Sequence, residues 1–141
     1  MNAKGFAQRT TILLAEDEPD DVFLIRSAFT ESGVPYQLSV VNDGDQAIQY
    51  LRGAGPYGDR TLHPMPFLLL LDLKMPVKSG FEVLEWVRGE AALDGLLVIV
   101  LSASALSTDS VHAKELGTNS YLVKSADYKQ LLLFLKSLNP K

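Results

Sequence analysis

The sequence predicts an α/β domain built on one parallel β-sheet of five strands, doubly wound so that five helices cover both faces. Short apolar runs alternate along the chain with segments of helical periodicity, which is typical of parallel strands joined by right-handed crossovers. The runs are also continuously apolar, as in Leu68-Leu69-Leu70-Leu71, and such runs predict strands buried on both faces. A chain of 141 residues, 47% of them hydrophobic, is long enough for one domain with its own core.

The expected strands end where polar residues or turn signals interrupt an apolar run. The first run stops at a group of acids around Pro19, and the Leu68 run enters Asp72 and is closed by Pro76. The expected strands are Thr11–Ala15, Gln37–Val41, Leu68–Leu71, Leu97–Leu101 and Ser120–Val123.

The expected helices carry apolar stripes or terminal signals. Val22, Ile25 and Phe29 lie on one face of the first helix, whose initial acids suit the helix dipole. Asp43 with Gln46 three residues later resembles a capping box at the start of the second helix. The expected helices are about Asp20–Ser32, Asp43 as cap to about Arg52, Gly80–Arg88, Ser107–Leu116 and Ala126–Leu138.

The remaining segments are expected to lie outside the packed elements. Residues 1–10 read as a flexible leader to a domain over residues 11–138, with no output domain after it. The segment Gly53–Pro66 joins a helix to a strand, so we expect a solvated loop at the sheet end opposite the strands' carboxyl ends. His63 and His112 are isolated in the sequence and are interpreted as surface residues.

The bulk composition excludes several classes of function. A net charge of -4 and a pI of about 5.1 give no basic surface for nucleic acid. The absence of cysteine excludes disulfides and thiolate metal sites. No apolar run approaches the roughly 20 residues that span a bilayer, and the polar start is not a secretion signal. We therefore expect a cytoplasmic protein that binds neither nucleic acid nor membrane.

Polar residues follow four of the five expected strands. Glu16 and Asp17 follow the first strand, Asp72 the third, Ser102 the fourth and Lys124 the fifth. Ligands of open parallel sheets bind at the carboxyl ends of the strands, so these side chains are expected to meet at one edge. A single such residue would be no more than the point where the chain leaves the core. The ordered set predicts a site.

The chemistry of this set favours a phosphoryl-transfer site with a hard cation. Carboxylates that lie close together repel unless a cation sits among them, and oxygen ligands favour Mg²⁺ or Mn²⁺. Lys124 is a point charge suited to a phosphoryl oxygen, and Ser102 can donate a hydrogen bond to another. The carboxylate of Asp72 could then attack phosphorus and form an acyl phosphate.

The sequence resembles the receiver domain of two-component response regulators over about residues 11–138. An acidic pair follows the first strand, a phosphoacceptor segment the third, a hydroxyl with a small neighbour the fourth, and an aromatic and a lysine mark the fifth. The segments that carry the resemblance are Leu14-Ala15-Glu16-Asp17, Leu71-Asp72-Leu73-Lys74-Met75-Pro76 with Gly80, Ser102-Ala103, and Tyr121 with Lys124.

The resemblance implies a flavodoxin-like strand order, 2-1-3-4-5, and a mechanism. Asp72 would accept a phosphoryl group from a phosphohistidine of a sensor histidine kinase. Glu16, Asp17, Asp72 and the backbone carbonyl of Lys74 would hold Mg²⁺. Ser102 and the aromatic residue Tyr121 would act as the switch, and the phosphorylated protein would signal through protein–protein contacts. It would be no enzyme beyond its own phosphoryl transfer and dephosphorylation.

Within this family the chain is most similar to the stand-alone regulators associated with bacterial phytochromes, so the kinase is expected to be phytochrome-type. The long Gly53–Pro66 loop and the Lys124-Ser125 ending carry that likeness. Family members usually have a proline after the lysine, often with a cis bond, which before a non-proline residue costs roughly 2.5–4 kcal/mol. Ser125 therefore predicts a trans bond and a shifted loop. The Lys74 side chain, two residues after the acceptor, could also reach the phosphoryl group.

Three alternatives stay open at this stage. Aspartyl phosphatases resembling the haloacid dehalogenase group carry a second aspartate two residues after the first, where this chain has Lys74. Nucleotide- or flavin-binding modules need a Gly-, Ser- or Thr-rich loop after the first strand, which here is acidic. A receiver-like docking module that works without phosphorylation would keep the fold alone.

The last expected helix has one leucine on its polar side. Leu133 falls opposite the core face of this helix, which is formed by Tyr128, Leu131, Leu132, Leu135 and Leu138. We expect either a single exposed leucine or a homodimer or partner surface on this helix.

Overall fold

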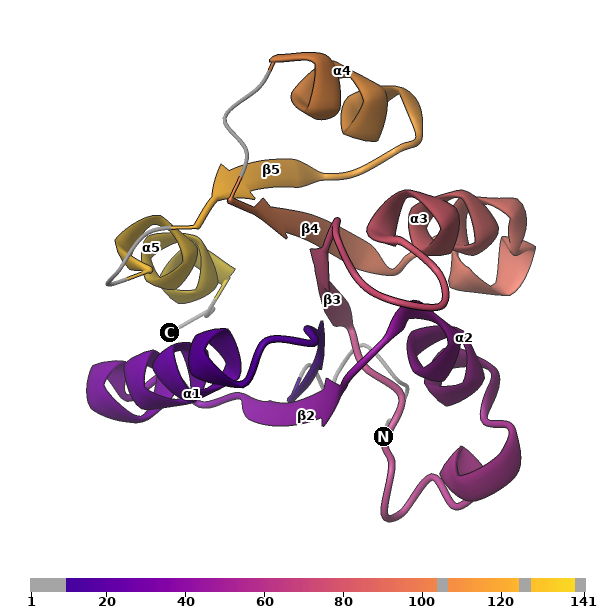
Figure 1. Ribbon diagram of the computed structural model, residues 1–141. Helices are drawn as coiled ribbons and strands as arrows, with labels where there is room; N and C mark the ends of the chain where they lie inside the picture. Colours follow the sequence, from indigo (N-terminus) through magenta and orange to yellow (C-terminus); the bar gives the residue numbers. More distant parts are fainter. Residues whose placement is uncertain (1–9, 104–106, 125–127, 139–141) are drawn as a thin grey trace.

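The computed structural model describes residues 10–103, 107–124 and 128–138, so residues 1–9 of the expected leader and the Lys124–Ser125 bond lie outside it. Its strands form one parallel sheet in the order β2-β1-β3-β4-β5, with helices on both faces (Figure 1). The expected α/β fold and its flavodoxin-like strand order are confirmed. The strands are β1 (Thr11–Ala15), β2 (Gln37–Val41), β3 (Leu68–Asp72), β4 (Leu97–Ser102) and β5 (Ser120–Val123).

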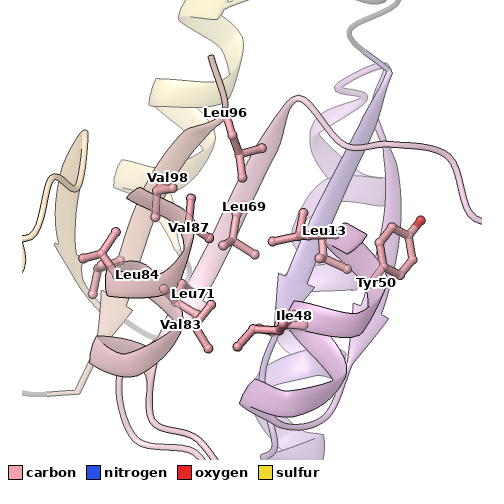
Figure 2. Packing of buried hydrophobic residues seen from close by; sticks show 14 of the residues in the cluster. Leu13, Ile48, Tyr50, Leu69, Leu71, Val83, Leu84, Val87, Leu96 and Val98 are labelled. Carbon is pink, nitrogen blue, oxygen red and sulfur yellow. The ribbon is translucent and has the colours of Figure 1, made fainter. Parts of the chain in front are cut away.

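The central strands are buried because both of their faces are covered. Every residue of β1 and β3 is buried, as continuous apolar runs predict. Leu69 and Leu71 belong to the hydrophobic cluster under α2, α3 and α4 (Figure 2), and Leu68 and Leu70 belong to the one under α1 and α5. The helices are α1 (Pro19–Ser32), α2 (Gly44–Arg52), α3 (Gly80–Gly89), α4 (Ser107–Glu115) and α5 (Lys129–Leu138), with 3₁₀ turns η2 (Gly55–Tyr57) and η3 (Ala91–Leu93).

The helix ends follow their capping signals with small differences from the prediction. The Asp43 side chain caps α2 by accepting from the Gln46 backbone at 2.8 Å, but Gln46 reaches back to the backbone of Asn42 instead of closing a full capping box. A complete capping box stands at Ser79 and Glu82, where α3 begins. The prediction that the last helix already includes Tyr128 is wrong. That residue has φ 51° and precedes α5, although its side chain is buried.

The Gly53–Pro66 loop, which we expected to be a solvated surface loop, is tied to α2 by Arg60 and also by Tyr50, whose hydroxyl donates to the Pro64 carbonyl at 2.9 Å. The Arg60 guanidinium donates to the Tyr50 carbonyl at 2.8 Å, the Leu51 carbonyl at 3.0 Å and the His63 carbonyl at 3.2 Å. The ring of His63 stacks edge-on against Tyr50, and the loop then enters β3 at its amino end. The loop is therefore ordered by hydrogen bonds to carbonyls, remote from the carboxyl edge of the sheet.

Two further observations concern the helices. Leu133 on α5 is 60% exposed, so its expected outward position is confirmed. Within the described ranges, no helix has both the length and the apolar character that a membrane crossing requires.

Candidate functional site

The polar residues that follow the strands meet at the carboxyl edge of the sheet. Glu16 directly follows β1, Asp72 ends β3, Ser102 ends β4 and Lys124 directly follows β5. Three of these are almost fully buried, with exposed fractions of 0% for Glu16, 5% for Asp72 and 1% for Ser102. Buried carboxylates need a cation, donors or protons around them. This edge therefore differs from an ordinary point where a chain leaves the core.

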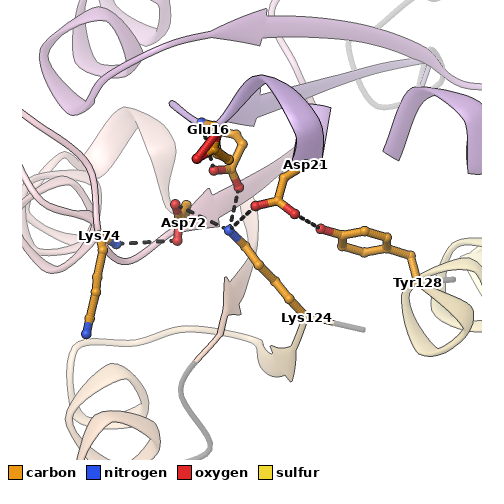
Figure 3. Close-up of polar contacts among 7 residues, drawn as sticks. Glu16, Asp21, Asp72, Lys74, Lys124 and Tyr128 are labelled. Atoms are coloured by element: carbon orange, nitrogen blue, oxygen red, sulfur yellow. Dashed lines mark hydrogen bonds and ion pairs between the residues drawn. The ribbon is translucent and has the colours of Figure 1, made fainter. Parts of the chain in front are cut away.

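One lysine amine forms ion pairs with three carboxylates at this edge (Figure 3). The Lys124 Nζ atom lies 2.9 Å from Glu16 Oε1, 3.0 Å from Asp21 Oδ2 and 3.5 Å from Asp72 Oδ2. The backbone amide of Lys124 donates to the Ser102 carbonyl at 2.7 Å, which fixes the end of β5 beside β4. The amine is thus held between the ends of β1, β3 and the first turn of α1.

The remaining negative charge is suited to a divalent cation. Carboxylate oxygens of Glu16, Asp17 and Asp72 lie within 4.8 Å of one another. The Asp17 side chain is exposed and the other two are buried, so the group opens to solvent on one side. All the donors are oxygens, which favours hard cations such as Mg²⁺, Ca²⁺ or Mn²⁺. These residues fit an acidic metal pocket.

The protonation behaviour of the cluster follows from burial and from the shared amine. Burial raises the pKa of Glu16 to about 7, and the charge of Asp72 acts in the same direction against the Lys124 hydrogen bond. Burial by itself lowers the pKa of Lys124, but hydrogen bonds to Glu16 and Asp21 outweigh it and hold that pKa above its ordinary value. The amine therefore stays charged near neutral pH, and Glu16 is poised between its two forms.

Backbone hydrogen bonds hold Asp72 and the residues that follow it in place. The Lys74 backbone amide donates to Asp72 Oδ1 at 3.3 Å, and the Gly80 amide donates to the Leu73 carbonyl at 2.8 Å. A Cβ atom at Gly80 would run into the Asp72 carbonyl and would lie 2.6 Å from Leu73 Cα. The first turn of α3 therefore approaches the end of β3 as closely as only glycine permits.

The predicted site residues are only partly brought together. Glu16, Asp17, Asp72 and Lys124 form one cluster, and Ser102 stands at the neighbouring strand end. Tyr121 lies on β5, half-buried against the core cluster under α2, α3 and α4. The Lys74 side chain is exposed and extends away from Asp72 in Figure 3, so this conformation does not support its predicted reach toward the acceptor.

Sequence reasoning missed two members of the cluster, Asp21 and Tyr128. Asp21 was interpreted only as an acid that suits the helix dipole, and Tyr128 only as part of an apolar face. The Tyr128 hydroxyl donates to Asp21 Oδ1 at 3.0 Å, and burial together with this bond raises the pKa of Tyr128. A signal was present: a tyrosine among leucines needs a partner for its hydroxyl. The partner's identity depends on tertiary structure.

Comparisons with known proteins agree with this geometry. Residues 12–136 match the family described as the response regulator receiver domain. The response regulator Rcp1 of Synechocystis sp. is 34% identical over 127 residues, which cover 90% of this chain and 84% of that protein.

Solved structures give the same result. The phosphorylated cyanobacterial phytochrome response regulator RcpA is 38% identical with a TM-score of 0.79, over 92% of this chain and 91% of that one. The Mn²⁺-bound form of Rcp1 is 33% identical with a TM-score of 0.77, over 92% and 91%. The bacteriophytochrome response regulator AtBRR is 34% identical with a TM-score of 0.81, over 93% of each chain. The chain is thus similar to phytochrome response regulators in both sequence and structure.

Proposed function

The chain belongs to the response regulator receiver domain family, and we propose that it signals by accepting a phosphoryl group on Asp72 from a sensor histidine kinase. The observation that carries this proposal is the Lys124 amine, which lies 3.5 Å from a nearly buried Asp72 carboxylate beside two further acids. A structural ion pair needs one acid for one amine. The surplus of acids is useful where a second cation and a phosphoryl group are to be bound.

The proposed transfer forms a single covalent bond to the protein. An Asp72 carboxylate oxygen attacks phosphorus, the new O–P bond forms as the P–N bond of the phosphohistidine breaks, and the imidazole leaves and takes a proton from solvent. Lys124 would bind one phosphoryl oxygen and Ser102 would donate to another. On this account the protein is no enzyme beyond its own phosphorylation and dephosphorylation.

The metal of this site is proposed to be Mg²⁺, with Mn²⁺ as a substitute. Glu16, Asp17 and Asp72 would hold it together with the backbone carbonyl of Lys74. The clustered oxygens support the proposal, and so does the Mn²⁺-bound form of Rcp1. A bound divalent cation supplies positive charge that offsets the charge of the phosphoryl group. Mg²⁺ suits such a site because it typically takes one or two carboxylates and phosphate oxygens.

The output is proposed to pass through the last part of the sheet. Ser102 at the end of β4 and Tyr121 on β5 would respond to the added charge, and the surface from Ser107 onward would present the change to a partner. The likeness to RcpA, Rcp1 and AtBRR supports a phytochrome-type sensor kinase as the phosphoryl source. The net charge of -4 supports a protein that does not bind nucleic acid, and we propose that it is cytoplasmic and does not bind a membrane.

Intact mass measured after incubation with acetyl phosphate and Mg²⁺ tests the proposal. We expect a gain of one phosphoryl group, lost without Mg²⁺ and lost in Asp72→Asn. Asp20→Asn serves as a matched control, because it removes an exposed acid on the neighbouring first turn of α1. A wild-type chain that gains no mass under these conditions would instead be a docking module that works without phosphorylation.

A further inference from the structure

Asp21 is a member of the cluster that neither the phosphoryl chemistry nor the proposed metal uses. It lies on the first turn of α1, and its side chain is 25% exposed. Its Oδ2 atom lies 3.0 Å from Lys124 Nζ, and its Oδ1 atom accepts the Tyr128 hydroxyl at 3.0 Å. Figure 3 shows Asp21 between these two partners. Both of its oxygens are therefore engaged by residues that lie more than a hundred positions away in the sequence.

The distances around the amine show which acids hold it. Lys124 Nζ lies 2.9 Å from Glu16 and 3.0 Å from Asp21, but 3.5 Å from Asp72. A lysine ammonium has three donors, and its attraction to each carboxylate falls with distance. Glu16 and Asp21 therefore bind the amine more closely than the proposed phosphoacceptor does.

We propose that Asp21 is a positioning residue that competes with Asp72 for the Lys124 amine until a phosphoryl group arrives, with Tyr128 orienting Asp21. This inference rests on the proposed function. A phosphoryl group carries close to two negative charges near neutral pH, so the amine follows it and leaves Asp21. Asp21 does not become a buried unpaired charge, because it is in contact with solvent and keeps the Tyr128 hydrogen bond. The loss of the Lys124 amine therefore costs Asp21 little free energy.

Under this proposal, replacing Asp21 and replacing Tyr128 should change the rate of phosphoryl uptake in the same direction. An uncharged side chain at position 21 holds the amine less tightly, so Lys124 reaches the reacting group sooner. Removing the Tyr128 hydroxyl while keeping its buried ring leaves one Asp21 oxygen unheld, and a quarter-exposed carboxylate can then turn toward water. A merely structural role would have the opposite sign, because a loosened site accepts phosphoryl groups more slowly.

The test is the initial rate of phosphoryl uptake from acetyl phosphate at saturating Mg²⁺, followed by intact mass. We expect Asp21→Asn to be about two- to fivefold faster than wild type, the scale of one partly exposed ion pair. Tyr128→Phe is expected to be faster than wild type by a smaller factor. The double variant is expected to match Asp21→Asn, because Tyr128 acts through Asp21.

Asp20→Asn is the matched control, since it removes the same charge one position away. Asp20 is exposed and makes no ion pair to Lys124 within the described ranges. It should leave the rate close to the wild-type value, and melting temperatures should show that every variant is folded.

Three results would overturn the inference alone. These are a slower rate in either single variant, an equal gain in Asp20→Asn and Asp21→Asn, and a double variant in which the two factors multiply. A wild-type chain that takes up no phosphoryl group overturns the proposed function, and this inference with it.

Discussion

Two half-buried cations organise opposite ends of this molecule, and their partners differ in kind. Arg60 donates to the carbonyls of Tyr50, Leu51 and His63, which are neutral acceptors. Lys124 faces the carboxyl groups of Glu16, Asp21 and Asp72, which are acids. The planar guanidinium of Arg60 therefore binds carbonyl oxygens, whereas the ammonium of Lys124 is a point charge among acids.

This difference indicates that the Arg60 end contributes to stability, whereas the charge at the Lys124 end is left unbalanced. At the end of α2 the Gly53 amide donates to the Tyr50 carbonyl, and Arg60 donates to the Tyr50 and Leu51 carbonyls, which are neutral. At the other end, Asp17 lies close to Glu16 and Asp72 as well, so one amine serves an excess of acids. The first arrangement has neutral acceptors, whereas the second has the surplus acids that the proposed cation and phosphoryl group would use.

The largest effect is expected where the end of β3 meets α3. Gly80→Ala should lower the free energy of unfolding by about 3 kcal/mol, because the new Cβ would overlap the Asp72 carbonyl and lie 2.6 Å from Leu73 Cα. Gly89→Ala at the other end of α3 has open space and should stabilise the protein by about 0.5 kcal/mol. Urea denaturation of both variants measures the difference. Equal stabilities would mean that the strand and helix are not in tight contact.

Arg60→Ala is expected to cost about 2 kcal/mol of unfolding free energy, since the Leu51 carbonyl loses the guanidinium donor, the Tyr50 carbonyl keeps only the Gly53 amide, and the stem loses its packing. Arg60→Lys should recover only part of this, because an ammonium cannot reproduce the fork. The exposed Arg52 on α2 provides the control, and its replacement by alanine should change stability little. Phosphoryl uptake should be unchanged in all three variants. A loss of uptake in Arg60→Ala would contradict the separation of the two ends.

Mg²⁺ is expected to stabilise the acidic end by binding the folded state. At ten times its Kd the gain should be about 1.4 kcal/mol, visible as a rise in melting temperature. Asp17→Asn should reduce this rise, because one of the clustered carboxylates is lost. Arg60→Lys, measured in parallel, should show the full rise. If Asp17→Asn responded to Mg²⁺ as wild type does, the ion would bind elsewhere.

The smallest effect on stability is expected on α5. Leu133→Lys should change the free energy of unfolding by no more than about 0.5 kcal/mol, because the side chain is 60% exposed. If this helix forms a homodimer or partner surface, the same change weakens association, which sedimentation velocity measures. An association state that is identical before and after the substitution removes α5 as the interface.

Most of the fold could be predicted because local patterns and burial coincide. The leucines of β3 show a strand buried on both faces, and Gly33 and Gly53 end their helices in the left-handed conformation that glycine favours. The helical start predicted before Tyr128 failed because periodicity cannot reveal a residue with positive φ. The Arg60 anchor was missed because its acceptors are backbone carbonyls, which carry no sequence signal.

The site was predictable only where topology determines position. Glu16, Asp72 and Lys124 come together because strand ends in a parallel sheet share one edge. Asp21 lies within α1, four residues after Asp17, and its contact with Lys124 depends on the tertiary packing that brings the first turn of α1 near the residue that follows β5. Such pairings require the tertiary structure.

The central claim is that the unbalanced acidic end receives a phosphoryl group on Asp72. Tandem mass spectrometry of peptides from the protein treated with acetyl phosphate and Mg²⁺ tests it most directly. The account predicts a single modified peptide, with the phosphoryl group on Asp72. A phosphoryl group on Asp17, Asp20 or Asp21, or none on any peptide, would contradict it.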